Sequence, residues 1–156
     1  MTLWFRPENM ILFKTIKWRN FLSTGNQFTE VNFQDAKTNL IVGTNGSGKS
    51  TILDALTFVL YNKPFRKINK PQLINSVNEK DCLVEIEFSV NSKEYKIIRG
   101  IKPNVFEIWC DGELLNQDAA SRDYQKVLEQ QILRLNYKTF TQEIGRAHVW
   151  TPVTWN

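Results

Sequence analysis

One short stretch has residues whose types and spacing suit the binding of phosphate groups. Residues 43–50 read Gly-Thr-Asn-Gly-Ser-Gly-Lys-Ser, which matches the pattern Gly-x-x-x-x-Gly-Lys-(Ser/Thr). Its glycines let the backbone curl so that successive N–H groups converge on one anion. A helix that begins near Lys49 adds the positive end of its dipole, about half an elementary charge. The stretch therefore predicts a loop that cradles the phosphates of a nucleotide.

Two side chains of this loop have separate expected tasks. Lys49 is expected to reach the β- and γ-phosphates of ATP, and the Ser50 hydroxyl is expected to ligate Mg²⁺. ATP and Mg²⁺ are thus the expected cofactors. The alternative from the residues alone is a glycine-rich turn that binds no ligand.

The elements that must position this loop are visible on both sides of it. Residues 38–43 form a short apolar run that ends in glycine and predict a buried strand. Residues 49–63 place apolar side chains at helical spacing, and Pro64 is expected to end that helix. The predicted order is therefore strand, loop, helix.

The rest of the chain predicts an α/β fold with antiparallel strands around the helix that follows the loop. Strands are expected at residues 11–21, 28–33, 82–90, 93–101 and 105–115, with the first two forming a hairpin. Residues 62–81 are polar and basic and predict a long loop. Residues 121–135 carry an apolar stripe at helical spacing behind Ser121, a suitable N-cap.

Hydrolysis by a P-loop ATPase needs a further acidic residue on a second strand and a group that activates water. Four apolar residues followed by Asp or Glu would indicate that strand, and no such run follows the loop. Glu85 and Glu87 come nearest, but their alternation predicts the solvent face of a strand. The chain is therefore expected to bind ATP but not to hydrolyse it alone.

Composition narrows the class of protein without naming a function. The 156 residues carry a net charge of +4, which permits a nucleic-acid partner without requiring one. There is no apolar run long enough to span a membrane and no secretory signal pattern. Cys82 and Cys110 lack metal-site spacing and are expected to be buried, reduced thiols, which favours a cytoplasmic location.

Both ends of the chain differ from the periodic part between them. Residues 1–9 are interpreted as an over-extended start, with Met10 as the first genuine residue. Residues 143–156 show no strand or helix period and look like a translated sequencing adaptor. His148 lies in this tail and is therefore not considered catalytic. The expected domain covers residues 10–142.

Several stretches together resemble one family. They are "KWRNFLSTG", "LIVGTNGSGKSTILDALTFVLYNKPFR", "INKPQLINS", "YKIIRGIKPNVFEI" and "YKTFTQ". These stretches are similar to the SbcC-type double-strand-break-repair ATPases, relatives of the SMC proteins, and most similar to the large subunits of tailed-phage recombination endonucleases. The resemblance implies the N-terminal lobe of an ABC-type P-loop ATPase head, truncated before the coiled coil and C-lobe.

The resemblance also implies roles for particular residues. The phosphates would be wrapped by Asn45, Gly46, Ser47, Gly48, Lys49, Ser50 and Thr51. Gln142 would be the glutamine that contacts the metal and the attacking water. Asn20 and Phe21 would lie beside the nucleotide. The position after them is often arginine in the family but is Leu22 here, so no charge contact is expected from Leu22, and Arg19 is the substitute candidate.

The partners implied by the resemblance are a second ATPase head, a nuclease subunit and double-stranded DNA. Four basic residues of the expected loop could contact DNA phosphates, although a solvated loop is the favoured interpretation: Lys63, Arg66, Lys67 and Lys70. The function predicted is therefore the ATP-binding lobe of a recombination or repair nuclease complex that acts on DNA ends. The alternatives are another SMC-type P-loop ATPase and a nucleic-acid-binding domain whose P-loop is vestigial.

Overall fold

The structure is a computed structural model that describes residues 2–4, 10–33, 46–115 and 121–146. The expected strand at residues 38–43 lies outside the described residues. The strands are β1 (Thr2–Trp4), β2 (Met10–Arg19), β3 (Thr29–Asn32), β4 (Cys82–Val90), β5 (Lys93–Ile101), β6 (Val105–Cys110) and β7 (Glu113–Leu114). The helices are α2 (Gly46–Tyr61), the 3₁₀ turn η1 (Lys70–Leu73), α3 (Ser121–Lys126), the π-helical η2 (Val127–Ile132) and α4 (Tyr137–Arg146).

The described strands form one sheet, in which every pairing is antiparallel. Its order is β1-β2-β4-β5-β6-β7, and β3 shares with β1 the edge of β2 that faces away from β4. This confirms the expected hairpin of β2 and β3 and the three consecutive strands β4, β5 and β6.

The register of these strands places a continuous apolar surface on one face of the sheet. The central cross-strand row consists of four fully buried isoleucines, namely Ile16, Ile86, Ile97 and Ile108. One neighbouring row consists of Trp18, Val84, Arg99 and Phe106. Arg99 is therefore a charged side chain on an otherwise apolar face, which calls for a partner in the layer above.

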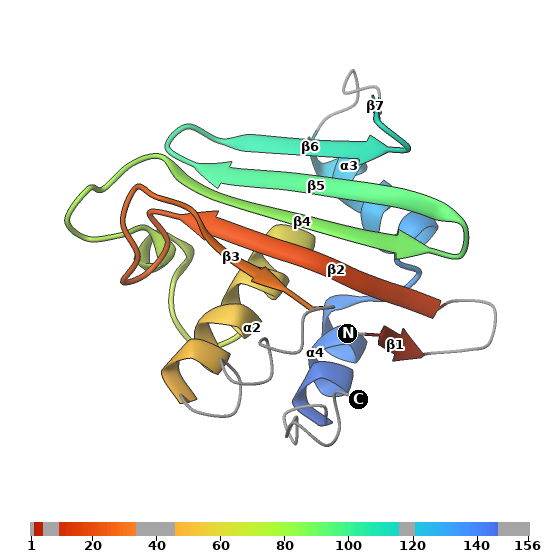
Figure 1. Cartoon of the computed structure of the whole chain (residues 1–156), viewed down its shortest axis with the longest axis horizontal. Helices are drawn as coiled ribbons and strands as arrows, with labels where there is room; N and C mark the ends of the chain where they lie inside the picture. Colours follow the sequence, from red (N-terminus) through yellow and green to blue (C-terminus); the bar gives the residue numbers. More distant parts are fainter. Residues whose placement is uncertain (1, 5–9, 34–45, 116–120, 147–156) are drawn as a thin grey trace.

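That layer consists of helices, which all cover the same face of the sheet (Figure 1). Helix α2 contacts β2, β4 and β5. The ring of Tyr124 in α3 packs edge-on against Phe106 of β6, with the ring centroids 5.0 Å apart. Phe140 of α4 packs against Phe13 of β2. The opposite face is polar, as shown by the ion pair of Lys17 Nζ with Glu85 Oε2 at 3.3 Å.

Three expected elements differ from the structure in extent. The strand expected at residues 105–115 is split by a two-residue turn at Asp111 and Gly112, whose φ angles are 51° and 85°. A type I′ turn requires this left-handed backbone at both positions, which Asp-Gly tolerates. The helix expected at residues 121–135 is α-helical only to Lys126 and then widens into η2. The long loop at residues 62–81 contains η1.

The two end segments also contain regular structure where none was expected. Residues 2–4 pair with Met10, Ile11 and Leu12 as β1. The expectation of no helix in residues 143–156 is wrong for residues 143–146, because α4 continues to Arg146. Residues 147–156, which include His148, lie outside the described residues. None of the described helices is long and apolar enough to cross a membrane.

The two cysteines occupy different environments, so the expectation of burial is confirmed for one of them. Both thiols are free; Cys82 is buried, whereas Cys110 is partly exposed. Burial raises the pKa of the Cys82 thiol to about 12, because the interior disfavours the thiolate.

Removal of the Phe140 ring should undock α4. Phe140 is fully buried against Phe13 and Tyr61, so Phe140→Ala should lower the free energy of unfolding by about 3–5 kcal/mol through lost burial and a cavity. Urea denaturation followed by circular dichroism measures this. Phe28→Ala is the control, since that ring is 41% exposed and should cost far less. Equal losses for the two variants would contradict the docking role.

Thiol labelling should separate the two cysteines. At pH 8 iodoacetamide should modify Cys110 in the folded protein and Cys82 only after urea is added, because a buried thiol with a raised pKa supplies almost no thiolate. Mass spectrometry of the labelled peptides gives the two rates. Rapid labelling of Cys82 without urea would show that β4 opens at its first residue.

Candidate functional site

The predicted phosphate loop coincides with the start of α2. The helix begins at Gly46, three residues earlier than expected, and its first residues are Gly46, Ser47, Gly48, Lys49 and Ser50. Thr51, half-buried, follows them, whereas Asn45 lies outside the described residues. The first N–H groups of a helix have no partner within it, so this end of α2 offers backbone donors and a positive dipole end. These donors fit a phosphate group.

After Thr51, helix α2 is buried all round. Each residue from 52 to 61 is less than a tenth exposed, including Asp54 and Thr57. The Thr57 hydroxyl donates to the carbonyl oxygens of Leu53 and Asp54, at 3.0 and 3.2 Å. A helix segment in this setting cannot tilt or slide without breaking its packing, so α2 is held firmly from residue 52 onward.

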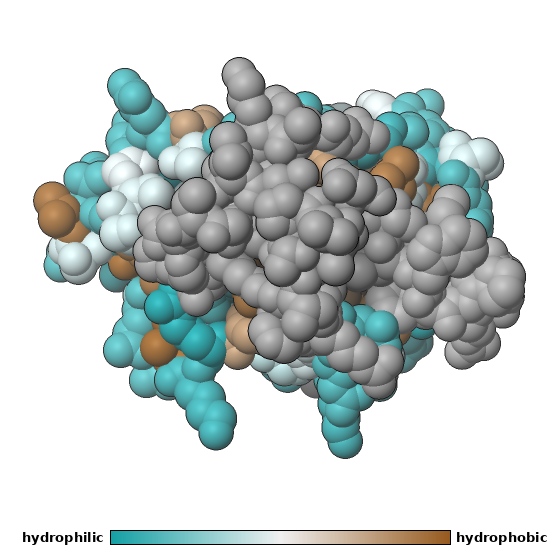
Figure 2. Space-filling view, turned by 60° about the horizontal axis from the view of Figure 1, so that its bottom comes forward, coloured by the Kyte–Doolittle hydropathy of each residue, from teal (hydrophilic) through white to brown (hydrophobic). Residues whose placement is uncertain are grey.

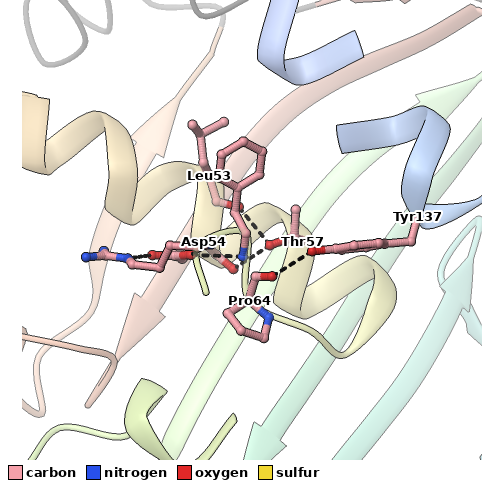
Figure 3. Close-up of polar contacts among 7 residues, drawn as sticks. Leu53, Asp54, Thr57, Pro64 and Tyr137 are labelled. Atoms are coloured by element: carbon pink, nitrogen blue, oxygen red, sulfur yellow. Dashed lines mark hydrogen bonds and ion pairs between the residues drawn. The ribbon is translucent and has the colours of Figure 1, made fainter. Parts of the chain in front are cut away.

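Asp54 fastens α2 to the segment that follows it (Figure 3). Its Oδ1 accepts hydrogen bonds from the backbone N–H groups of Phe65 and Arg66, at 2.9 and 3.0 Å. Its Oδ2 pairs with Arg66 Nε. The Asp54 side chain is 1% exposed and that of Arg66 is 44% exposed, so the carboxylate is internal while the guanidinium reaches solvent. The sequence interpretation missed Asp54; an acidic residue between apolar neighbours on a buried helix was the available signal.

Gln142 lies on α4, the helix that packs beside the second half of α2. Its side chain is exposed. Two hydroxyls fix this helix: Tyr137 Oη donates to the Pro64 carbonyl at 2.8 Å, and Tyr61 Oη donates to the Leu135 carbonyl at 2.7 Å. The helices run in opposite directions, so the end of α4 and the start of α2 lie on the same side of the molecule, away from the sheet (Figure 1). The described residues at the rim of this side are largely hydrophilic (Figure 2).

Asn20 and Phe21, which were expected beside the nucleotide, are both buried. The Asn20 side-chain amide donates to Asn26 Oδ1 at 3.0 Å and to the Asp81 carbonyl at 3.2 Å, and its oxygen accepts from Asn78 Nδ2 at 2.7 Å. The Phe21 ring lies 6.0 Å from that of Phe58 in α2. Asn20 therefore joins the loop that follows β2 to the loop that precedes β4.

The residues on either side of this pair also face protein groups. The Leu22 backbone N–H donates to the Leu73 carbonyl at 2.7 Å, and the Leu22 carbonyl accepts from Asn75 Nδ2 at 2.9 Å. The Arg19 guanidinium lies 5.1 Å from the centre of the Phe28 ring. These contacts tie Leu22 to η1 and the residues after it, and Arg19 to the ring of Phe28.

The structure separates the four basic residues that were grouped as a DNA-contacting loop. Lys63 Nζ lies 5.1 Å from the centre of the Tyr137 ring, Arg66 pairs with Asp54, and Lys67 is exposed. Lys70 is half-buried, and its pKa is lowered by burial and then by the positive charge of Arg99. Lys63, Arg66 and Lys67 are exposed, as the favoured interpretation of a solvated loop expects, and only Lys70 is half-buried.

The glutamates of β4 lie on the polar face of the sheet, as expected. Glu85 pairs with Lys17, and Glu87 accepts a hydrogen bond from Thr15 Oγ1 at 3.0 Å. The described residues contain no group of three or more His, Cys, Asp and Glu side chains that could hold a metal ion.

An antiparallel sheet covered on one face by a helix that starts at a Gly-x-Gly-Lys-Ser loop defines the N-terminal lobe of an ABC-type P-loop ATPase head. A solved structure described by the words "ATP-driven dimerization and DNA stimulated activation of SMC ATPases" has the same fold, with a TM-score of 0.56 and 21% identity over 92% of this chain and 94% of that one. This confirms the expected fold class.

A protein family described as "AAA domain" matches residues 15–147, and the chain belongs to this family, among its SbcC-like members. The chain is 45% identical to "Exonuclease subunit 2" of Enterobacteria phage T4 over 81% of its length and 22% of that protein. It is 34% identical to "DNA double-strand break repair Rad50 ATPase" of Sulfolobus acidocaldarius, over 58% of its length and 10% of that protein. The chain thus spans about a fifth of the phage relative, and the resemblance seen in the sequence is confirmed.

Substitutions at Asp54 should separate its two tasks. Asp54→Asn keeps the Oδ1 acceptor for the two backbone N–H groups but loses the ion pair with Arg66. Because the Arg66 side chain is 44% exposed, water screens this ion pair and its contribution is small. The expected loss is about 1 kcal/mol of unfolding free energy. Asp54→Ala also leaves both N–H groups unsatisfied and should cost about 3 kcal/mol. Urea denaturation measures both values.

Arg66→Ala is the matched control, because it removes only the charge partner. Its loss of unfolding free energy should be similar to that of Asp54→Asn. If Asp54→Ala cost no more than Arg66→Ala, the backbone hydrogen bonds of Asp54 would contribute nothing to stability.

Proposed function

We propose that this chain binds Mg·ATP at the start of α2 and serves as the nucleotide-binding lobe of a repair ATPase that acts on DNA ends. The observation that carries the proposal is the coincidence of the Gly-x-Gly-Lys-Ser motif with the first residues of a buried helix. Such a helix holds its free N–H groups in a fixed direction, which favours a phosphate over water.

The roles within the site follow from the chemistry of each residue. The phosphates are bound by Asn45, Gly46, Ser47, Gly48, Lys49, Ser50 and Thr51. Lys49 neutralises the terminal phosphates, and Ser50 ligates the magnesium ion that bridges them. Gln142, exposed on α4, approaches the same ion and its water. The site lies within a lobe formed by residues 10–142.

The partners belong to the proposal as well. The phage relative is named as an exonuclease subunit, which supports a nuclease subunit as one partner. The solved SMC structure is described by ATP-driven dimerization and DNA-stimulated activation, which supports a second head and double-stranded DNA. The chain works inside the cell, in the host cytoplasm for a phage protein.

Turnover is proposed to need groups that this lobe does not provide. The β4 glutamates are on the far face of the sheet and are engaged there by Lys17 and Thr15. A strand carboxylate that holds the metal therefore has to come from another part of the machine. The chain alone is expected to bind ATP without steady phosphate release.

Isothermal titration of the chain with Mg·ATP tests the proposal. Binding in the millimolar range or tighter is expected, and Lys49→Ala should weaken it at least about tenfold because a charge-assisted phosphate contact is lost. Lys67→Ala is the control, since this exposed lysine lies outside the site. Absence of binding by the folded chain would favour the alternative of a vestigial loop in a nucleic-acid-binding domain.

The same titration locates the metal contacts. Ser50→Ala and Gln142→Ala should reduce the gain in affinity that Mg²⁺ gives, while leaving metal-free ATP binding nearly unchanged. A Gln142→Ala chain with an unaltered magnesium effect would remove Gln142 from the site and leave Lys49 and Ser50 in it.

A further inference from the structure

A pocket lies at the opposite end of α2 from the phosphate loop. It has a volume of about 840 Å³. Its walls come from the end of α2, from η1, from β5 and β6, and from the α3–η2 segment. Pockets of this size accommodate small ligands. None of the roles assigned above uses it.

Four of the thirteen residues that line this pocket are cationic. They come from four separate segments and are Lys63, Lys70, Arg99 and Lys126. Glu129 is the one carboxylate among the lining residues, and it already accepts a hydrogen bond from Gln125 Nε2 at 2.9 Å. Within the described ranges of the chain, neither Lys70 nor Lys126 has an acidic partner. The pocket thus has an excess of positive charge.

Arg99 anchors the pocket to α2. It is 5% exposed, its Nε donates to the Val59 carbonyl at 3.1 Å, and its Nη2 donates to Gln125 Oε1 at 2.5 Å. Gln125 Nε2 also donates to the Leu60 carbonyl at 2.9 Å. The Val59 and Leu60 carbonyl groups at the negative end of α2 are therefore hydrogen-bonded to Arg99 and Gln125. An anion in the pocket would face cationic side chains and not these carbonyl oxygens.

The protonation behaviour of this cluster agrees with its geometry. Burial lowers the pKa of Arg99 to about 9, and Glu129 opposes this only in part. Burial, followed by the charge of Arg99, lowers the pKa of Lys70. Both shifts reflect cations that burial removes from water, and a bound anion would stabilise their charged forms.

We propose that this pocket binds a phosphate group, with Lys70 and Lys126 as the direct contacts and Arg99 as the positioning residue. Phosphate suits the site because it accepts several charge-assisted hydrogen bonds and is recognised by clustered cations without base-specific contacts. The group comes from a free phosphate compound or from a DNA strand. The site is separate from the proposed nucleotide site and does not depend on it.

The test uses the full chain carrying Lys49→Ala, which weakens phosphate binding at the start of α2. Inorganic pyrophosphate is titrated by calorimetry, and a short labelled DNA duplex by fluorescence anisotropy at several salt concentrations. Lys70→Gln and Lys126→Gln are each added to this chain, and each should lower the affinity for the probe about tenfold. For the duplex, each should also reduce the salt dependence by about one phosphate contact. Lys67→Gln is the control, an exposed lysine outside the pocket lining.

The outcomes separate the two sources of phosphate. If pyrophosphate binds and its binding depends on Lys70 and Lys126, the pocket is assigned to a free phosphate compound. If only the duplex binds, with the same dependence on the two lysines, the pocket is assigned to DNA. Thermal unfolding confirms that the variants fold. The proposal is overturned if neither probe binds, or if Lys67→Gln weakens binding as much as the pocket variants. ATP binding by the chain without Lys49→Ala would then remain intact, so the two proposals fail separately.

Discussion

A helix that is buried on every side cannot leave its backbone carbonyl groups to water, and this constraint on α2 governs the rest of the structure. The carbonyl groups of Val59 and Leu60 are met by Arg99 of β5 and Gln125 of α3, and Asn62 ends the helix in the left-handed region with a φ of 63°. Satisfying this helix end therefore joins the sheet and α3 to α2. The other end of the helix is where the proposed nucleotide site lies.

The same helix organises the segments around the proposed nucleotide site. Asp54 holds the segment after the helix, and the Tyr61 and Tyr137 hydroxyls hold the start of α4. The position of Gln142 thus depends on contacts made about one to two turns before it along the chain. The Tyr61 contact is buried and the Tyr137 contact is partly buried, and both fix the start of α4 against the end of α2 and the segment that follows it.

Much of the fold follows from patterns within single segments. The alternation in β4 predicted Glu85 and Glu87 on the polar face, and the helical spacing after Ser50 predicted α2. The predictions failed where contacts with distant segments determine the local structure. No local pattern marks the widening of residues 127–132 into a π-helix, and the grouping of Lys63, Arg66, Lys67 and Lys70 rested on proximity in sequence alone. In three dimensions Arg66 turns to Asp54, while Lys70 joins Arg99.

The sequence by itself determined the glycine-rich motif at the start of α2, the order of the described elements and the family, because each depends on which residue types stand close together along the chain. Only the tertiary structure decided the roles of Asp54, Arg99 and Gln125. Their partners include backbone groups of distant or differently oriented segments, such as the Val59 carbonyl and the Phe65 N–H. Backbone groups are the same in every residue other than proline, so such pairings leave no mark in the sequence and arise only when packing brings the segments together.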